Sequence, residues 1–304
     1  MSTLPAKQTL FTTALLLLIA TCSAACSAAC SPPPEVLPGQ SGSTAAPELT
    51  AAPSPTVQHS ATPAPSPTAQ PSRTASPTAS PTPALSICSP LEGIALEEMG
   101  EPDLLKVPFE EPRPGMDDGH HGADFAYYSR GERKEMIGLP VYSVLNGIVA
   151  GVIHDRPPYG NAVIIETRIE AFSPEQFNRL QAPTLAPTVQ PPANLTCPEP
   201  EKTASMPAGR SLYLLYAHLN QPPLVSTGQA VSCGQQIGEV GTTGNSVNPH
   251  LHLETRIGPS GAVFPSMAHY DASITEEEMR NYCIWRVSGL FQMFDPMLLL
   301  SLQP

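Results

Sequence analysis

Four apolar runs, separated by turns rich in glycine and proline, dominate the chain between residues 139 and 257. They are rich in valine, isoleucine and leucine, and they cover residues 139–155, 161–169, 211–219 and 250–257. Short apolar runs between such turns are typical of antiparallel strands, and a long helical periodicity is absent from this part of the sequence. Asn146-Gly147 predicts a turn inside the first run. The pattern predicts a mainly β fold: an antiparallel β-sheet or sandwich-like domain with short helices and a long loop insertion.

Two short segments carry the signals of helix starts. Ser173 followed by Pro174 is an N-cap with proline at the first helical position, which predicts a short helix. Thr275 and Glu278 form a capping box, which predicts a second helix beginning there. We expect Trp285, inside this second helix, to pack in the core rather than to serve as a platform for a ligand.

The stretch from residue 168 to residue 210 interrupts the strands. It contains the first of the two helices and a proline-rich patch, and irregular connections of this length are uncommon in compact domains. Two interpretations stay open. The insertion either borders a functional site or is a tolerated surface loop.

Proline divides the chain into regions. Of 38 prolines in 304 residues, 14 lie in residues 31–86, together with only three charged residues. Such a segment has little apolar surface to bury, so burial cannot offset the entropy of ordering it. We expect residues 26–86 to form a disordered linker rich in Pro, Ser and Thr, and residues 87–304 to form the folded domain.

A signal peptide is expected at residues 1–25. A single basic residue precedes an apolar run over residues 10–20, which is too short to span a bilayer comfortably. Ile19–Cys22 resembles a bacterial lipobox, in which the cysteine is lipidated after cleavage, and the small residues before Cys26 also fit one. We expect an extracytoplasmic lipoprotein anchored to the cell membrane through Cys22 or Cys26. A cleaved, secreted soluble form and an uncleaved anchor are the alternatives.

The predicted domain carries nearly all of the net charge of −12. An acidic surface argues against a nucleic-acid partner, because binding to phosphates needs clustered Lys and Arg. We expect a monomer that binds no nucleic acid.

Four cysteines lie in the predicted domain: Cys88, Cys197, Cys233 and Cys283. Outside the cytosol an even number of cysteines favours disulfides. The sequence alone allows three pairings. We expect Cys88 to pair with Cys283, which would tie the two ends of the domain, and Cys197 to pair with Cys233. Free buried thiols are the alternative.

The segment HLHLE places two histidines on one side of a predicted strand. Residues two apart in a strand point to the same face, so His250 and His252 project together and Glu254 shares their face. Two imidazoles on one face can approach one metal ion or one substrate. Taken alone, however, an H-x-H pattern more often marks two surface histidines on an amphipathic strand.

Two further segments carry candidate ligands. His120 and Asp124 are four residues apart and share a face in an extended segment, which the neighbouring His121 does less naturally. His218 ends an apolar strand, where a single histidine is usually a core or edge residue. Histidine and carboxylate together are ordinary zinc ligands, so a fold that joins the three segments would form a metal site.

The neighbours of these residues resemble the lysostaphin-type, or LytM-like, zinc metallopeptidases, which cut bacterial cell-wall peptides. The motifs follow one another within residues 107–300: H-x-G-x-D at His120–Asp124, G-x-P-V at Gly138–Val141, Y-G-N at Tyr159–Asn161, Y-x-H-L at Tyr216–Leu219, a glycine-rich run before His250–His252, and D-P at Asp295-Pro296. The departures are Val247-Asn248 in place of Thr-Gly, Leu253 in place of Phe, and a longer insertion at 168–210. None of them removes a polar position of the motifs.

The resemblance implies a function and a set of roles. It implies a zinc metalloendopeptidase that hydrolyses peptide bonds in peptidoglycan, with peptidoglycan peptides as its partner. It implies Zn²⁺ held by His120, Asp124 and His252, and it implies His218 and His250 as catalytic residues. One would activate water and the other would stabilise the transition state, without an individual assignment of the two roles. The alternative is a non-catalytic module that binds the cell wall or activates another wall hydrolase. Retention of all five polar residues argues against that alternative.

Overall fold

The computed structural model describes residues 85–113, 116–182, 194–198 and 209–302. All of them belong to one of two compact units of the chain, Ala75–Pro304, while the other unit, Met1–Thr74, lies outside the described residues. The expected signal peptide at 1–25 and all but the last two residues of the expected linker at 26–86 therefore stay predictions. Residues 183–193 and 199–208 of the insertion also lie outside the described residues. Within the described ranges, none of the helices has the length and apolar character needed to cross a membrane.

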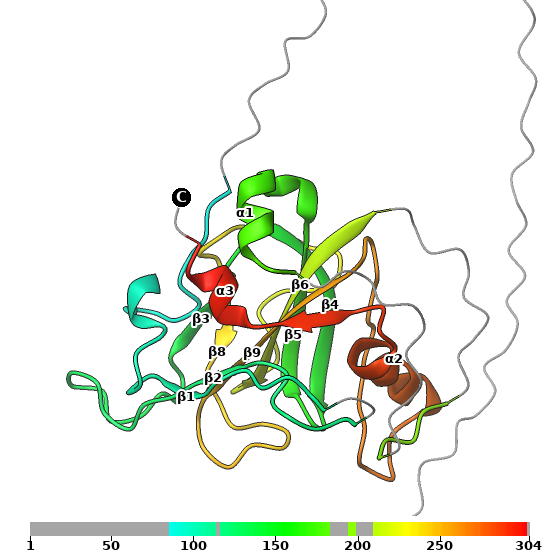
Figure 1. Ribbon diagram of the computed structural model, residues 1–304. Coiled ribbons are helices and arrows are strands. Elements are labelled where there is room, and N and C mark those ends of the chain that lie inside the picture. The colour runs from blue at the N-terminus through cyan, green and yellow to red at the C-terminus, as the bar shows by residue number, and fades with distance from the viewer. Residues whose placement is uncertain (1–84, 114–115, 183–193, 199–208, 303–304) are drawn as a thin grey trace, which may run out of the picture. The chain divides into compact units, whose positions relative to one another are not determined.

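An antiparallel sheet of eight strands forms the centre of the described unit (Figure 1). Its strands lie in the order β1-β2-β9-β6-β5-β4-β7, and β10 also pairs with β9. These strands are β1 (Leu105–Val107), β2 (Ala123–Phe125), β4 (Gly147–Arg156), β5 (Gly160–Arg168), β6 (Arg210–Leu219), β7 (Ala230–Val231), β9 (Leu251–Pro259) and β10 (Gln292–Phe294). A separate pair joins β3 (Pro140–Tyr142) to β8 (Gln236–Glu239). The predicted mainly β, antiparallel fold is confirmed.

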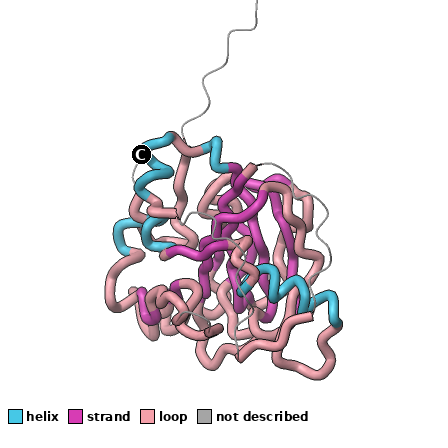
Figure 2. Tube along the Cα trace, turned by 45° about the vertical axis from the view of Figure 1, so that its right-hand side comes forward, coloured by secondary structure: helices cyan, strands magenta, loops and turns pink. Residues whose placement is uncertain are grey.

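The long strands are apolar on both faces because both faces of the sheet are covered. On β6, Leu212 and Leu214 point into one hydrophobic core, while Tyr213 and Leu215 point into the other. Short helices α1 (Pro174–Arg179) and α3 (Pro296–Leu300) contribute to the first core, and α2 (Glu276–Val287) contributes to the second. In Figure 2 the helices accordingly lie on either side of the strands. Burial on both faces explains the nearly continuous apolar runs of the sequence.

Both predicted helix starts are confirmed. The Ser173 side chain accepts a hydrogen bond from the backbone of Gln176 at the start of α1, and the Thr275 side chain accepts one from Glu278 at the start of α2. Trp285 of α2 is fully buried, as expected. Two single 3₁₀ turns, η1 (Leu96–Glu98) and η2 (Ile169–Ala171), complete the helical elements of the described residues.

The predicted turn at Asn146-Gly147 is a bend between two sheets rather than a hairpin. The strands before and after it, β3 and β4, do not pair, because β3 joins β8 while β4 joins β5 and β7. A Cβ atom on Gly147 would collide with the backbone carbonyl of Glu166 and the side chain of Ile165. Glycine is therefore required here by close packing against β5.

The disulfides pair differently from the expected Cys88–Cys283 and Cys197–Cys233. The bonds are Cys88–Cys233 and Cys197–Cys283, with Cα–Cα distances of 5.6 and 5.9 Å. Cys88 lies beside β3 and β4, because its N–H donates to Val144 O, and Asn146 of the same connection accepts from the N–H of Cys233. The expected pairing was wrong because Cys88 lies beside the connection between β3 and β4, next to Cys233, and not beside Cys283 of α2.

Glu278 makes stability depend on pH. Its carboxylate accepts two hydrogen bonds of 2.7 Å from Arg156 and one from Ser266, and it completes the capping box with Thr275. The hydrogen bonds from Arg156, with those from Thr275 and Ser266, outweigh burial and lower the pKa of Glu278 to about 2. Because the folded-state pKa is lowered, the stabilisation is present above the usual carboxyl pKa. It is lost as the pH falls from about 4.5 to about 2.

We expect Glu278→Gln to lower the free energy of unfolding at neutral pH by about 1–2 kcal/mol, because the charge-assisted pair with Arg156 is lost, whereas a glutamine can still complete the capping box. Urea unfolding across the pH range should show the difference from the wild type shrinking toward pH 2. Glu277→Gln is the matched control, since it removes an equal charge from an exposed position in the same helical turn. An equal loss in both variants would assign the effect to the helix dipole instead of the Arg156 contact.

Candidate metal centre

Three neighbouring strands bring the separated histidine segments together. β2 pairs with β9 so that Asp124 lies opposite His252, and β6 pairs with β9 so that Ala217 lies opposite the same histidine. His218 follows Ala217 at the end of β6, and His250 directly precedes β9. Asp124 and His252 are 128 positions apart in the sequence, so the register of the sheet, and not local spacing, assembles the candidates.

His120, Asp124 and His252 form a group that could hold a metal ion. One potential ligand atom from each lies within 4.8 Å of the others. Asp124 Oδ1 lies 3.1 Å from His120 Nε2 and 2.7 Å from His252 Nδ1. The structure thus brings together the three residues predicted as ligands, while their role as ligands stays a prediction.

Hydrogen-bond partners on the outer side fix the orientation of both imidazoles. His120 Nδ1 lies 3.0 Å from the carbonyl oxygen of Pro108, and His252 Nε2 lies 3.3 Å from a carboxylate oxygen of Glu254. A proton on each of these nitrogens leaves the other nitrogen, Nε2 of His120 and Nδ1 of His252, as a lone-pair donor facing Asp124. Two such nitrogens and a carboxylate form the donor set of a catalytic zinc site, so the residues fit a metal ion.

The charges at this point also fit a cation. Burial alone would raise the pKa of Asp124, but hydrogen bonds from His120 and His252 outweigh it, so the pKa lies well below its usual range. Burial alone would lower the pKa of His252, but the carboxylates of Asp124 and Glu254 raise it to about 9. Carboxylates that stabilise a proton on His252 would also stabilise a cation in its place, with release of that proton.

Glycine in the H-x-G-x-D segment is explained by close packing. A Cβ atom on Gly122 would collide with the backbone carbonyl of Leu253 and would touch the ring of His252. Only glycine therefore lets the chain between His120 and Asp124 lie against β9. The motif therefore combines two candidate ligands, His120 and Asp124, with a glycine that lets them approach the third, His252.

His218 and His250 lie beside the ligand group. Their ring centroids are 4.7 Å apart, and the ring centroid of His218 lies 5.8 Å from that of His252. Each Nδ1 is 2.8 Å from a backbone carbonyl, that of Thr243 for His218 and that of Asn248 for His250. When Nδ1 carries the proton, each imidazole presents Nε2 for proton transfer; that of His250 lies 3.6 Å from Asp124 Oδ1.

His218 is held in a strained backbone conformation. Its φ is +61°, in the left-handed region that costs a non-glycine residue about 1–2 kcal/mol. Its N–H donates to the carbonyl of Tyr159 at 2.9 Å, which holds this conformation. Burial, together with the charges of His252 and His250, lowers the pKa of His218 to about 3. Strain at a buried histidine of this kind is characteristic of functional sites.

Residues 201–264 match the model of peptidase family M23. The matched segment covers 64 of the 304 residues. The segment contains His218, His250 and His252, so three of the five candidate residues fall in it and His120 and Asp124 lie outside. The match supports a hydrolase of the metallopeptidase type.

Several solved structures align with the chain at low sequence identity. A zinc-containing peptidase from Vibrio cholerae is 21% identical, with 70% of this chain and 39% of that chain covered and a TM-score of 0.35. The catalytic domain of the M23 protein EnpA from Enterococcus faecalis is 20% identical, with 53% of this chain and 85% of that chain covered and a TM-score of 0.30. The catalytic domain of lysostaphin from Staphylococcus simulans is 18% identical, with 64% of this chain and 90% of that chain covered and a TM-score of 0.32. The chain spans less than half the length of the Vibrio protein.

A buried charged group lies behind His252. The Glu254 carboxylate is fully buried and accepts hydrogen bonds from Tyr159, Arg256 and Trp285, all at 2.8–2.9 Å, besides its contact with His252. The twofold period of a strand places Glu254 on the face of His250 and His252, but the sequence assigns it no role. The polar residues at every second position from 250 to 256 indicate that these side chains share one face of the strand.

His121 belongs to this buried group and not to the ligand group. Its Nδ1 lies 3.0 Å from the guanidinium of Arg256, and its Nε2 lies 3.1 Å from the carbonyl of Asp118. Burial, with the positive charges of Arg286 and Arg256, lowers the pKa of His121 to about 2. The preference for His120 over His121 as the candidate ligand agrees with this placement.

Proposed function

We propose that this protein is a zinc-dependent endopeptidase that hydrolyses peptide bonds in bacterial peptidoglycan. The proposal is carried by one observation: His120, Asp124 and His252 converge within 4.8 Å, and two further histidines lie beside them. The M23 match supports the peptidase chemistry. The resemblance of the motifs to lysostaphin-type enzymes supports peptidoglycan as the substrate.

The ligand residues in this proposal are His120 through Nε2, His252 through Nδ1, and Asp124. Three protein ligands of this kind leave a coordination position open for reactants. When bound, zinc would supply a Lewis acid that makes water a stronger acid and polarises the carbonyl of the peptide bond. Pro108 and Glu254 would hold the two imidazoles in the orientation that binding requires.

His218 and His250 would perform the proton transfers. With Nδ1 donating to a backbone carbonyl, the Nε2 atom of a neutral imidazole can accept a proton from the attacking water. The same atom, once protonated, can donate a hydrogen bond to the developing oxyanion or a proton to the leaving amine. Two such groups side by side allow one to act as base and the other as acid.

The site of action is part of the proposal. A leader with a candidate lipidated cysteine and a proline-rich segment of 56 residues, 31–86, would place a monomeric domain outside the cytoplasm, tethered to the membrane and within reach of the cell wall. Peptidoglycan peptides are the proposed partner. Membrane fractionation of Cys22→Ala and Cys26→Ala variants tests the anchor. We expect one of the two substitutions to release the protein into the soluble fraction. If both variants stay in the membrane fraction, the proposed lipid anchor is contradicted.

A digest of purified peptidoglycan by the full-length protein tests the function. We expect new peptide termini, identified by mass spectrometry, with zinc present and none with a chelator, because the ligand group cannot act without its ion. Restoration by added zinc controls for damage by the chelator. The absence of new fragments under every metal condition would contradict the proposal and would favour a module that only binds the wall.

A further inference from the structure

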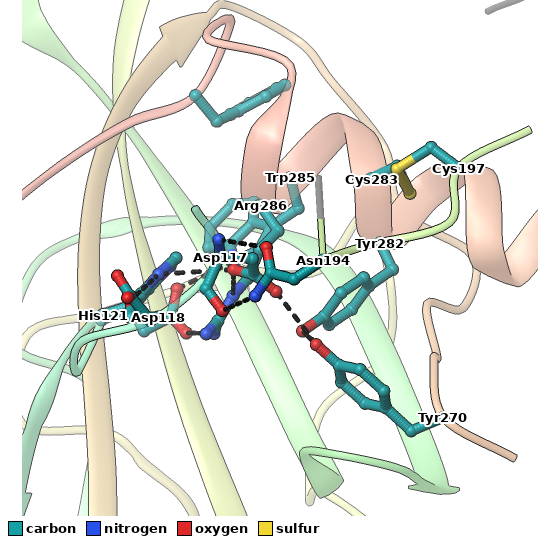
Figure 3. Close-up of polar contacts among 12 residues, drawn as sticks. Asp117, Asp118, His121, Asn194, Cys197, Tyr270, Tyr282, Cys283, Trp285 and Arg286 are labelled. Carbon is teal, nitrogen blue, oxygen red and sulfur yellow. Dashed lines mark hydrogen bonds and ion pairs between the residues drawn. A yellow bond between two sulfur atoms is a disulfide. The ribbon is translucent and has the colours of Figure 1, made fainter. Parts of the chain in front are cut away.

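Residues 194–198 of the insertion lie against the segment that leads to His120. The Asn194 side chain makes two hydrogen bonds to the backbone of Asp117: its Oδ1 accepts from the N–H at 2.9 Å, and its Nδ2 donates to the carbonyl at 3.0 Å. Figure 3 shows Asn194 and Asp117 side by side. The insertion leaves β5 and enters β6 at the end of these strands away from His218, because Arg168 pairs with Ser211 and Asn161 with Leu219. Residues 194–198 nevertheless reach Asp117, three residues before His120.

Three contacts fix residues 194–198 themselves. Cys197 forms a disulfide with Cys283 of α2 (Figure 3). The carbonyl of Thr196 accepts a hydrogen bond of 2.8 Å from His269, and Leu195 is buried in the second hydrophobic core. The segment is therefore covalently and noncovalently attached to α2 and its surroundings, and Asn194 projects from this attachment toward Asp117.

Asp117 is held on its other side by its carboxylate. The carboxylate is almost completely buried, and it accepts hydrogen bonds of 2.7 Å from Arg286 and 2.9 Å from Tyr270. Arg286 of α2 also lies 3.8 Å from Glu254, the residue behind His252. Asp117 thus joins the residues preceding His120 to the same helix that carries the disulfide.

His120 lies outside the paired strands that hold the other two candidate ligands. Asp124 and His252 lie in paired strands, β2 and β9. His120 precedes β2, and its described backbone contacts are the two hydrogen bonds with Glu110 across an isolated bridge. Before His120, Asp118 contacts His121 and Arg113, and Asp117 is the point at which Asn194 fixes the chain.

We propose that residues 194–198 are a clamp for the metal centre, in which Asn194 is a positioning residue for His120 and the Cys197–Cys283 disulfide holds Asn194 in place. The link to metal binding rests on the proposed function, whereas the mechanical link from Asn194 to the segment at Asp117 does not. Asn194 contacts none of the candidate ligands and acts through the backbone.

Two measurements on three variants of the full-length protein test the clamp. Asn194→Ala removes both hydrogen bonds, the Cys197→Ser/Cys283→Ser pair removes the anchor, and Cys88→Ser/Cys233→Ser removes the other disulfide as the matched control. In metal-free protein, hydrogen exchange around Asp117 should become about tenfold faster in the first two variants and stay unchanged in the third. Zinc affinity, measured by competition with a chelating dye, should fall about tenfold in the same two variants only.

The outcomes separate the clamp from a general loss of stability. The control disulfide closes a longer loop, 145 residues against 86, so its removal should destabilise the fold at least as much. An equal fall in zinc affinity in both disulfide variants would overturn the proposal, as would Asn194→Ala with unchanged exchange at Asp117. Wild-type protein that binds no zinc would overturn the proposed function, and the exchange measurement would still decide the clamp. If the Cys197→Ser/Cys283→Ser protein does not fold, Asn194→Ala alone decides.

Discussion

The His218→Ala variant is expected to keep its zinc and to lose peptidoglycan hydrolysis. Removal of a group that transfers a proton in the transition state should slow turnover by about 10²–10⁴-fold. The metal should stay, because the group that could hold it comprises His120, Asp124 and His252 and does not include His218. Metal analysis of the purified variant, together with the rate of release of new peptide termini, measures both quantities on one sample.

His218→Ala has a matched control at a neighbouring candidate ligand, His252. His252→Ala removes a ring that lies 5.8 Å away, centroid to centroid, and that belongs to the candidate ligand group. This variant should lose both zinc and activity. Zinc retained by His252→Ala would contradict the ligand assignment. Wall digestion that requires a second enzyme and survives His218→Ala would identify the protein as an activator instead.

The long strands were predictable from sequence and the short ones were not. β4, β5, β6 and β9 carry nine or ten residues each and form nearly continuous apolar runs, because both faces of the sheet are covered. β2 has three residues and no pattern of its own. It is a strand because β9 offers it a partner, and such a partner is a property of the folded sheet.

The part of the candidate site that depends on residue spacing and on short motifs was predictable from the sequence. The same-face placement of His250, His252 and Glu254 follows from the twofold period of a strand. The disulfides were mispredicted, because pairing depends on which segments the finished fold brings within bonding distance. The contact of Asn194 with Asp117 spans 77 positions, and no local pattern in the sequence announces such a contact.

Glu254→Gln is expected to damage stability and metal binding together. The carboxylate is fully buried between Arg256, Trp285, Tyr159 and His252. Burial alone would raise its pKa, but Arg256 and His252 hold the pKa well below the usual range, so the group is charged. An amide would leave the buried guanidinium of Arg256 without its counter-charge. We expect a loss of about 3–5 kcal/mol in the free energy of unfolding.

The effect of Glu254→Gln on zinc follows from the hydrogen bond to His252. The carboxylate holds Nε2 and so directs Nδ1 toward Asp124, and loss of such a partner weakens metal binding by about 10–100-fold. Tyr159→Phe is the milder companion, because it removes one hydrogen bond of 2.8 Å to Glu254 and keeps the charge. It should cost about 1 kcal/mol and should change zinc affinity much less. Urea unfolding of the metal-free protein and zinc competition separate the two effects. A folded Glu254→Gln protein with wild-type zinc affinity would show that Glu254 balances Arg256 and does not orient His252.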